Sequence, residues 1–504
     1  MTGLSDRSMT RRRYLQTTAL ASAALSFGSI RGFGRNTVSK PMKRQVGRIG
    51  FEATTLGLGG QASLQWTPSD VDTTRIILKA FALGINYFDT SNMYGPSQTN
   101  YGRAFRELHL IPGEPGYNEK LRRSMFLTTK TGLRWAKGGW QKPGLGSFTN
   151  GPRDSKTVDD IHRSLSQMFG DGQGNYPAGA YLDMVLMHSL TSMAEVDALY
   201  EGYGKADPKA ENIGAIAALV DLRDGSNLTG LNPKGEKLIR HIGFSGHHSP
   251  AVNMEMMQRD ERNVLDAMLV AINANDRLQF NMQYNAIPLA VARNMGLIAM
   301  KTFADGAMYA KPSRWSMRPD DVVRTVGSAS LASRPLVQYS LTTPGIHTLI
   351  IGTGHVDDDA AACQLQQNLA AAQVKANGLT VTDRRAIEKQ TAPVKDGKTN
   401  YFQAAVQALT APREVGAETL TRDGKRVVRV TWQTAYAGDE PIERYEVRRG
   451  GTKIGVVAHK PQASKAPFAF EDLHADGASY AYSVVSVDAV GRTAASADLR
   501  VVTG

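Results

Sequence analysis

The chain has 504 residues, 41% of them hydrophobic and 21% charged, a composition typical of a soluble globular protein with two or more domains. The net charge of +12 does not indicate a nucleic-acid partner, because six arginines and one aspartate lie in residues 1–38 and the other basic residues form no stripe. The single cysteine, Cys363, excludes an internal disulfide and a cysteine-based zinc or iron–sulfur site, and it suits an oxidising compartment.

Residues 1–38 are expected to be an export signal and its linker. TRRRYLQ (10–16) precedes a weakly apolar run (17–27) that is too short to span a bilayer as a helix. This arrangement resembles a twin-arginine signal, which implies a periplasmic or otherwise extracytoplasmic protein. The resemblance leaves two outcomes open, removal of the signal or an uncleaved tether at the membrane surface. The alternative to a signal is a disordered basic tail.

Residues 39–375 alternate short apolar runs with longer amphipathic stretches. The expected strands are TTLGLGG (54–60), NYFDTS (86–91), MFLTTKTG (125–132), DMVLMHS (183–189), RHIGFSG (240–246), AMLVAIN (267–273), GLIAMKT (296–302) and HTLIIGT (347–353). Helical spacing of apolar residues is clear in 155–170. Eight strand–helix units predict an α/β fold, a closed (β/α)8 TIM barrel with a parallel sheet, and residues 44–54 predict a hairpin on its floor.

The composition changes near residue 410, after an expected linker at 376–410. Residues 411–504 show short alternating apolar runs separated by turns, which predict an all-β, immunoglobulin-like sandwich. Four residues resemble in their placement the core of a fibronectin type III domain: Trp432, Tyr445, Leu473 and Tyr480, the last at the tyrosine corner. The resemblance implies a domain that contacts a protein or a carbohydrate.

Four polar side chains follow three neighbouring predicted strands: Asp89, Tyr94, Lys130 and His188. Because the carboxyl ends of barrel strands meet at one rim, we expect these side chains to lie together. A lysine ammonium stabilises a phenolate and lowers the phenol pKa from about 10, while a carboxylate keeps the lysine charged. A neutral imidazole orients a carbonyl oxygen beside the phenol. The pattern predicts a proton-donating site and no metal site, since His188 has no paired histidine and no cysteine nearby in the sequence.

The spacing of Asp89 and Tyr94 in FDTSNMYG, followed by TKTG and DMVLMHS, resembles the aldo-keto reductase superfamily over about residues 44–369. The resemblance implies that Tyr94 is the general acid/base, that Lys130 and Asp89 tune it, and that His188 orients the substrate. It also implies an oxidoreductase that transfers hydride between a nicotinamide cofactor and a small carbonyl or alcohol substrate.

The same resemblance implies where the cofactor binds. The side chains expected near the nicotinamide are Ser245, one of Gln283, Asn285 and Asn273, and either Met300 or Lys301. Gly352 and Gly354, after the last strand, would present backbone N–H groups to a phosphate. Three aspartates (357–359) follow where family members often hold a basic residue for the 2′-phosphate, so the choice between NAD and NADP stays open.

Two other classes of function remain. The barrel with its four polar residues could serve as a non-catalytic extracytoplasmic binding protein, or the sandwich could make the chain a structural interaction protein. Titration with NADH and NADPH separates the enzyme from the binding protein, and removal of residues 411–504 tests the role of the sandwich.

Overall fold

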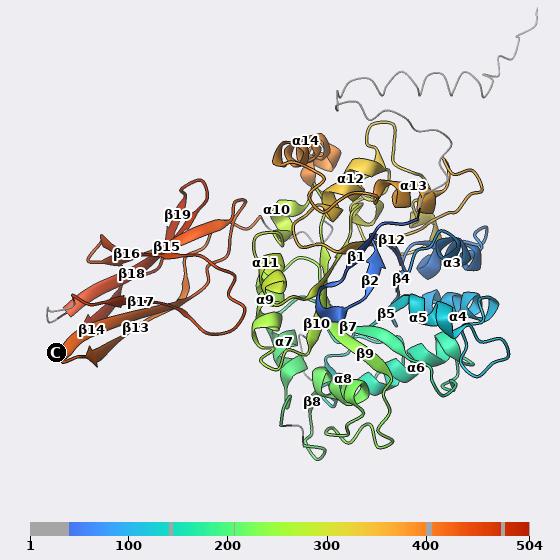
Figure 1. Ribbon diagram of the computed structural model, residues 1–504, viewed down its shortest axis with the longest axis horizontal. Helices are drawn as coiled ribbons and strands as arrows, with labels where there is room; N and C mark the ends of the chain where they lie inside the picture. Colours follow the sequence, from blue (N-terminus) through green and yellow to red (C-terminus); the bar gives the residue numbers. More distant parts are fainter. Residues whose placement is uncertain (1–39, 141–144, 206, 400–405, 475–478, 503–504) are drawn as a thin grey trace, which may run out of the picture.

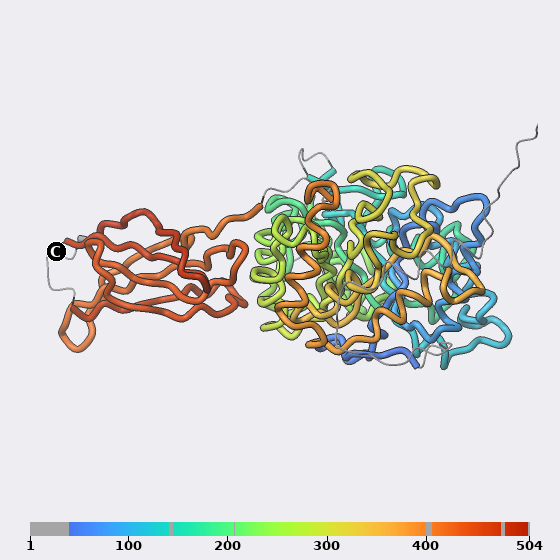
Figure 2. The backbone as a smooth tube through the Cα atoms, turned by 90° about the horizontal axis from the view of Figure 1, so that it is seen from above, coloured from blue at the N-terminus to red at the C-terminus, as the bar shows by residue number. Residues whose placement is uncertain are grey.

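The computed structural model describes residues 40–140, 145–205, 207–399, 406–474 and 479–502, and the predicted export signal lies outside them. Figure 1 shows two bodies, a rounded barrel and a long flat β-structure beside it, and Figure 2 shows the same two bodies end to end. Among the described residues, no helix has both the length and the apolar character needed to cross a membrane.

In the described residues, eight parallel strands close a barrel in the order β10–β11–β12–β3–β4–β5–β7–β9. Their bounds are β3 Leu56–Gly59, β4 Tyr87–Asp89, β5 Phe126–Thr131, β7 Leu182–Leu190, β9 Ile239–Gly246, β10 Leu265–Ala271, β11 Gly296–Met300 and β12 Thr348–Gly352. Each strand falls within or overlaps one predicted apolar run, so the predicted (β/α)8 barrel is confirmed. The runs are continuous because the interior covers one face of each strand and helices cover the other.

Helices surround the barrel, as Figure 1 shows. The helices between strands include α2 Ser63–Trp66, α3 Thr73–Ala82, α4 Ser97–Glu107, α5 Glu119–Ser124, α6 Thr157–Phe169, α7 Met193–Tyr200, α8 Ala215–Asp224, α9 Pro250–Gln258, α10 Arg277–Phe280, α11 Ala286–Ala292, α12 Ser333–Leu341 and α13 Gln364–Ala371. A small antiparallel pair, β6 Trp135–Lys137 and β8 Ile213–Gly214, lies in the loops. Helix α6 lies within the predicted helical stretch, and its apolar stripe is buried.

The floor of the barrel is closed by an antiparallel hairpin, β1 Lys43–Gln45 and β2 Glu52–Thr54, as predicted. Gly47 in its turn has φ +47°, and a Cβ there would lie 2.5 Å from the carbonyl carbon of Met295, just before β11. Only glycine fits both the backbone conformation and this close approach. Because the hairpin covers the amino ends of the strands, the carboxyl ends form the open end.

The C-terminal body is a β-sandwich of antiparallel sheets in the described residues. One sheet has the order β13–β14–β17, and the other has β16–β15–β18–β19 with β20 also paired to β18. The bounds are β13 Arg413–Arg422, β14 Lys425–Gln433, β15 Ile442–Arg449, β16 Thr452–Ala458, β17 Phe468–Asp472, β18 Ser479–Asp488, β19 Thr493–Ala495 and β20 Leu499–Val502. Trp432 and Tyr445 are fully buried between the sheets, as predicted.

The prediction for Leu473 and Tyr480 was wrong in detail. Leu473 is 59% exposed, because it follows β17 on the surface. Tyr482, two residues after Tyr480 on the same strand face, is the tyrosine that is fully buried, and its hydroxyl donates to the Asp472 carboxylate at 2.8 Å. Both tyrosines share one face because side chains alternate along a strand, and the inner position belongs to the second.

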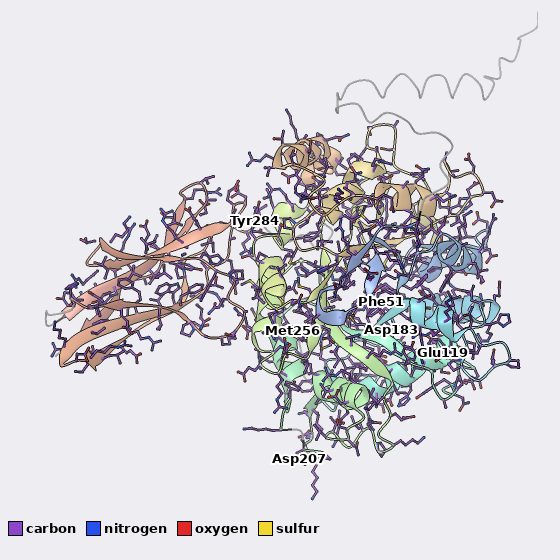
Figure 3. All side chains as sticks on the ribbon, in the orientation of Figure 1. Phe51, Glu119, Asp183, Asp207, Met256 and Tyr284 are labelled. Carbon is purple, nitrogen blue, oxygen red and sulfur yellow. The ribbon has the colours of Figure 1, made fainter. Side chains whose placement is uncertain are left out.

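The stretch 376–410, predicted as a linker, contains helix α14 (Val381–Thr391), which packs against α12. The sandwich then docks on the barrel flank that α9 and α11 form (Figures 1 and 2). Tyr284, at this junction in Figure 3, packs against the sandwich core. Asn285 accepts a hydrogen bond from the Ala437 N–H at 2.8 Å and donates to the Ala437 carbonyl at 3.2 Å.

Candidate active site

Lys130 and Asp89 form a buried ion pair at the open end of the barrel. Asp89 ends β4, Lys130 lies near the end of the adjacent β5, and the Lys130 Nζ atom is 2.5 Å from Asp89 Oδ1 and 2.9 Å from the Thr90 carbonyl. Burial raises the pKa of the Asp89 carboxyl and lowers the pKa of the Lys130 ammonium, while their mutual attraction opposes both shifts. Each charge therefore depends on the other for compensation.

Tyr94 lies in the turn after β4, with its ring beside this pair. The Lys130 Nζ atom is 4.7 Å from the ring centroid, and Tyr94 Oη is 3.4 Å from His188 Nε2. Burial raises the Tyr94 pKa well above its usual value, and the negative charges of Asp89 and Asp305 raise it further. The predicted lowering of the phenol pKa by Lys130 was wrong in direction for this structure, because Asp89 compensates the lysine and the phenol is desolvated.

His188 lies near the end of β7 between two aromatic rings. Its Nδ1 atom is 3.2 Å from Ser91 Oγ, and its ring centroid is 5.5 Å from that of Tyr94 and 5.6 Å from that of Phe148. Burial lowers the His188 pKa well below its usual value, and the positive charge of Lys130 lowers it further. The imidazole is therefore neutral at pH 7, as the sequence predicted for an orienting residue.

Arg134 fixes the backbone beyond His188. Its guanidinium is fully buried and donates to the His188 carbonyl at 2.8 Å and to the Ser189 carbonyl at 3.2 Å, and it lies 3.5 Å from the Glu195 carboxylate. Sequence reasoning missed this residue, because TGLRW has no periodic or spacing signal. A buried arginine between two loops is visible only once both loops are placed.

A cleft opens beside Asp89 and Tyr94 at the carboxyl ends of the strands. It encloses about 990 Å³, counting the part open to solvent, and residues 59–62, 300–303, 305–306 and 350–352 line it together with a long segment, 321–327, apart from Arg324. Barrel enzymes carry their active sites at this end. The four residues predicted as catalytic lie together at this end of the barrel, and two of them, Asp89 and Tyr94, line the cleft.

Two of the predicted cofactor residues, Met300 and Gly352, line this cleft, and Lys301 lines it as well. Lys301 Nζ donates to Gln61 Oε1 at 3.1 Å, and burial lowers its pKa to about 8. Ser245 is fully buried next to the end of β7, where its hydroxyl accepts the Ser189 N–H at 2.8 Å. Gln61 was missed, although it follows the first barrel strand and its position at the open end could have identified it.

The structure does not bring the three predicted amide contacts into the cleft. Asn273 donates to the Asp276 carboxylate at 3.0 Å and to a backbone carbonyl, and its oxygen accepts backbone N–H groups. Asn285 contacts Ala437 of the sandwich. Gln283 also lies outside the cleft, so no cleft contact supports these three assignments.

The Gly354 N–H is engaged within the protein. Both this group and the His355 N–H donate to Gln364 Oε1, at 2.8 and 2.9 Å. The same Gln364 side chain donates to the Val323 and Thr325 carbonyls, at 3.2 and 2.8 Å, which holds the long cleft segment against the end of β12. Of the two predicted glycines, Gly352 lines the cleft and Gly354 does not.

The residues of the cleft fit a dinucleotide. Polar side chains that line it include Gln61, Lys301, Thr325, Ser333, Gln364 and Asn368, together with the acidic Asp305 and Asp321, and glycines 59, 60 and 352 leave its wall open near the phenol. A cleft wall that has few side chains and several hydrogen-bond donors suits phosphate and sugar groups. Within the described ranges, no group of three or more His, Cys, Asp or Glu side chains could hold a metal ion.

The chain belongs to the aldo/keto reductase family, whose sequence model matches residues 55–324. This region contains Asp89, Tyr94, Lys130 and His188, and it ends in the long segment that lines the cleft. The family assignment agrees with the barrel and with the resemblance seen in FDTSNMYG.

Among curated proteins, the chain is 30% identical to D-arabinose 1-dehydrogenase of Saccharomyces cerevisiae over 237 residues, 46% of this chain and 54% of the relative. It is 29% identical to a putative voltage-gated potassium channel subunit beta of Schizosaccharomyces pombe over 148 residues, 26% of this chain and 43% of the relative. The chain thus spans about half the length of these relatives.

Among solved structures, the chain is similar to an aldo-keto reductase from Klebsiella pneumoniae in complex with NADPH, with 16% identity and a TM-score of 0.43 over 70% of this chain and 96% of that chain. Another is an aldo-keto reductase of Pseudomonas aeruginosa, with 21% identity and a TM-score of 0.38 over 66% of this chain and 93% of that chain.

Proposed function

We propose that this chain is an oxidoreductase that uses NAD or NADP to interconvert a small carbonyl compound and its alcohol. The observation that carries the proposal is the Tyr94 hydroxyl, which borders the cleft, lies 3.4 Å from His188 Nε2 and has the buried Lys130 ammonium beside its ring. A proton donor next to a neutral imidazole suits a carbonyl oxygen that gains negative charge.

The roles of the chain's own residues follow from their charges. Tyr94 keeps its proton at pH 7 because its pKa is raised, so it acts as the acid in the reduction direction. Its buried neighbour Lys130 stabilises the phenolate that remains after proton transfer, and Asp89 holds Lys130 in place. His188, neutral and fixed by Ser91, orients the carbonyl oxygen toward the phenol.

The cofactor is assigned to the cleft that Met300, Lys301 and Gly352 line. When bound, a nicotinamide cofactor supplies or accepts the hydride. The match of residues 55–324 to the aldo/keto reductase family model supports this choice. The choice between NAD and NADP stays open.

The test is Tyr94→Phe, which removes only the phenol oxygen. We expect kcat for carbonyl reduction to fall by about 10² to 10⁴-fold, the range for loss of a general acid, with little change in cofactor affinity. A matched control is Tyr101→Phe, since Tyr101 is equally buried and contacts the Asp89 backbone, 3.4 Å from its carbonyl. Unchanged turnover in Tyr94→Phe would show that the phenol is not the acid.

A second candidate is a non-catalytic binding protein. The observation that favours it is the engagement of predicted cofactor contacts within the protein, Asn273 by Asp276 and Gly354 by Gln364. Fluorescence titration with NADH and NADPH separates the two functions, because binding of neither supports the second candidate.

Export and the role of the sandwich belong to the same proposal. The TRRRYLQ run supports a periplasmic or other extracytoplasmic location after twin-arginine export, with a membrane-surface tether if the signal is retained. The buried Trp432 and Tyr445 support a fibronectin type III-like sandwich that contacts a protein or carbohydrate. Fractionation of cells that express the full chain, with and without Arg11 and Arg12 replaced by Lys, tests export.

A further inference from the structure

Ser91 lies between Asp89 and Tyr94 in the turn after β4, and it is fully buried. Its Oγ atom is 3.2 Å from His188 Nδ1 and accepts the Met93 N–H, also at 3.2 Å. The other nitrogen of the imidazole, Nε2, is 3.4 Å from Tyr94 Oη. The three side chains thus form one line of hydrogen bonds from a serine, through the histidine, to the phenol.

The direction of these hydrogen bonds follows from the number of protons available. A serine hydroxyl has one proton to donate, and neutral histidine has one N–H and one bare nitrogen. The Met93 N–H donates to Ser91, so a hydrogen bond from Ser91 to Nδ1 leaves both groups satisfied. If Nδ1–H donated instead, the buried Ser91 proton would have no acceptor among the described contacts, and an unmet buried donor is destabilising.

Neither nitrogen of His188 contacts a carboxylate, so no partner favours a doubly protonated ring. The cations around it are Lys130, Arg134 and Lys301, and the neighbouring His247 is neutral because burial lowers its pKa well below the usual value. The imidazole therefore carries a single proton. Because Tyr94 Oη can either donate to Nε2 or accept from it, the hydrogen bond with Ser91 decides which nitrogen holds that proton.

We propose that Ser91 is a positioning residue that holds the His188 proton on Nε2, and thereby keeps the Tyr94 proton free for the substrate. With Nε2–H donating to Tyr94 Oη, the phenol is an acceptor toward the histidine, and its own O–H points elsewhere. With the opposite tautomer, the bare Nε2 would take the phenol proton as a hydrogen-bond acceptor and compete with the substrate oxygen.

The consequence for catalysis rests on the proposed function, but the tautomer does not. The decisive measurement is the 15N spectrum of the His188 ring in the full chain without substrate or cofactor, because protonated and bare ring nitrogens differ widely in chemical shift. The chain has ten histidines, and the spectrum of His188→Gln identifies the His188 signals by their loss. We expect the proton on Nε2. A proton on Nδ1 in the unaltered protein overturns the proposal.

Two variants test whether Ser91 is the cause. Ser91→Ala removes the donor and should shift the proton wholly or partly to Nδ1, and Ser91→Thr, which keeps a hydroxyl, should restore the Nε2 tautomer. The control is Ser97→Ala, a fully buried serine of the same region whose Oγ is 2.9 Å from Thr90 Oγ1. An unchanged tautomer in Ser91→Ala, or an equal change in Ser97→Ala, overturns the assignment to Ser91.

The kinetic readout uses the same variants. In Ser91→Ala we expect kcat to fall about tenfold, which corresponds to about 1.4 kcal/mol, with KM within about twofold, because the hydrogen bond between His188 and the phenol then runs in the opposite direction. A bare Nε2 stabilises the protonated phenol, so the alkaline limb of the pH profile should move to higher pH. The charged and titratable groups that face the phenol and imidazole stay the same in all variants: Asp89, Lys130, Arg134, His247, Lys301 and Asp305.

The two proposals fail in different ways. A protein without reductase activity that still shows the proton on Nε2 refutes the proposed function and leaves the role of Ser91 intact. An active enzyme whose Ser91→Ala variant keeps the wild-type tautomer and pH profile refutes the role of Ser91. Recovery of both readouts in Ser91→Thr supports it.

Discussion

The Lys130 ammonium lies 2.5 Å from the Asp89 carboxylate, and neither side chain is more than 2% exposed. The second carboxylate oxygen of Asp89 is buried without a hydrogen-bond partner in the described structure. In the described structure, the Lys130 ammonium thus contacts one carboxylate, that of Asp89, and donates a second hydrogen bond to the Thr90 carbonyl. Breaking a buried pair by removing one partner is strongly destabilising, whereas removing both partners is not.

The first prediction is a double-mutant cycle on this pair. Lys130→Met and Asp89→Asn should each lower the free energy of unfolding by about 3–5 kcal/mol, because each leaves an uncompensated buried group, and the double variant should lose less than the sum. Urea unfolding measures the three values. The exposed pair Arg123–Glu119 provides the control, since its removal should change the stability by less than about 1 kcal/mol. Additive losses at Lys130 and Asp89 would contradict the coupling.

The sequence predicted the barrel and the four polar residues well for a local reason. Continuous apolar strands repeat along the chain, and Asp89, Lys130 and His188 each follow or end such a run, so the topology alone brings them to one rim. The direction of the Tyr94 pKa shift was not predictable in this way. It depends on how deeply the phenol is buried and on Asp305, which is far away in the sequence.

The residues that face the cofactor cleft were harder to predict, because the hydrogen-bond partners of each side chain decide whether it points into the cleft. Asn273 ends a strand and was expected in the cleft, but Asp276, three residues on, takes its amide. The segment 321–327 that lines the cleft has no periodic pattern, and only the packing of Gln364 against it reveals its place. The prediction that Leu473 lies in the core of the sandwich was wrong for a similar reason, since apolar character alone does not distinguish a core residue from an exposed one.

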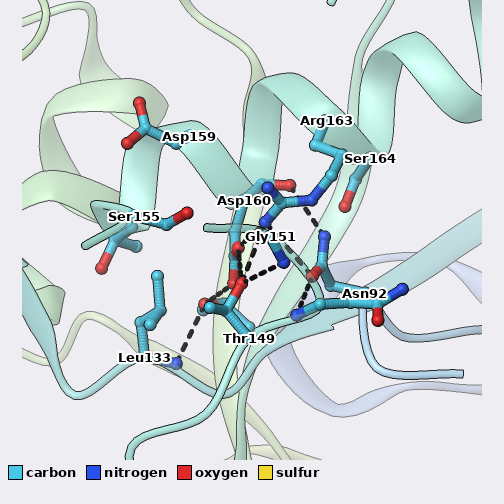
Figure 4. Close-up of polar contacts among 12 residues, drawn as sticks. Asn92, Leu133, Thr149, Gly151, Ser155, Asp159, Asp160, Arg163 and Ser164 are labelled. Carbon is cyan, nitrogen blue, oxygen red and sulfur yellow. Dashed lines mark hydrogen bonds and ion pairs between the residues drawn. The ribbon is translucent and has the colours of Figure 1, made fainter. Parts of the chain in front are cut away.

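The second prediction concerns the loop that carries Phe148. Figure 4 shows Asp160 and Arg163 of α6 joined to Thr149 of this loop and to Asn92 of the Tyr94 turn. The Thr149 hydroxyl donates to Asp160 Oδ1 at 2.7 Å, and Arg163 also contacts the Asp160 carboxylate. The network therefore ties the loop beside His188 to the turn that carries the phenol.

Asp160→Asn should weaken this network, because an amide offers one acceptor oxygen in place of two. We expect a loss of about 1–3 kcal/mol in stability and faster amide hydrogen exchange in residues 145–151 than in the unaltered chain. Asp159→Asn is the control, since Asp159 is exposed and bonds only the helix start at Lys156. Equal exchange in 145–151 for both variants would contradict the role of Asp160.

The third prediction concerns the junction between barrel and sandwich. Gln258 donates to the Gln462 carbonyl at 2.9 Å, and Asn285 makes two hydrogen bonds with Ala437. These buried amides replace the charged groups that an exposed barrel flank usually carries. We therefore expect the two bodies to unfold together in a single calorimetric transition.

Gln258→Ala combined with Asn285→Ala should separate the transition into two, because each change leaves buried backbone groups unpaired at about 1–3 kcal/mol. Gln373→Ala serves as the control, since its amide accepts the Met42 N–H at 2.8 Å within the barrel. This control should lower the midpoint temperature of the single transition without separating it into two. A single transition in the double variant would show that other contacts hold the bodies together.

The last prediction is a pH dependence of the sandwich, caused by His459. Its Nδ1 is 3.1 Å from the Tyr445 hydroxyl, and burial lowers its pKa from 6.5 to about 4. Between pH 6.5 and 4 the unfolded chain takes up a proton that the folded chain does not, so stability should fall as the pH drops through this window and level off below it.

Urea unfolding followed by fluorescence of the buried Trp432 measures the effect. His459→Gln should remove this part of the pH dependence, whereas His474→Gln, at an exposed position of the same sandwich, should retain it. An identical pH dependence in the unaltered chain and His459→Gln would mean that His459 is not the titrating group.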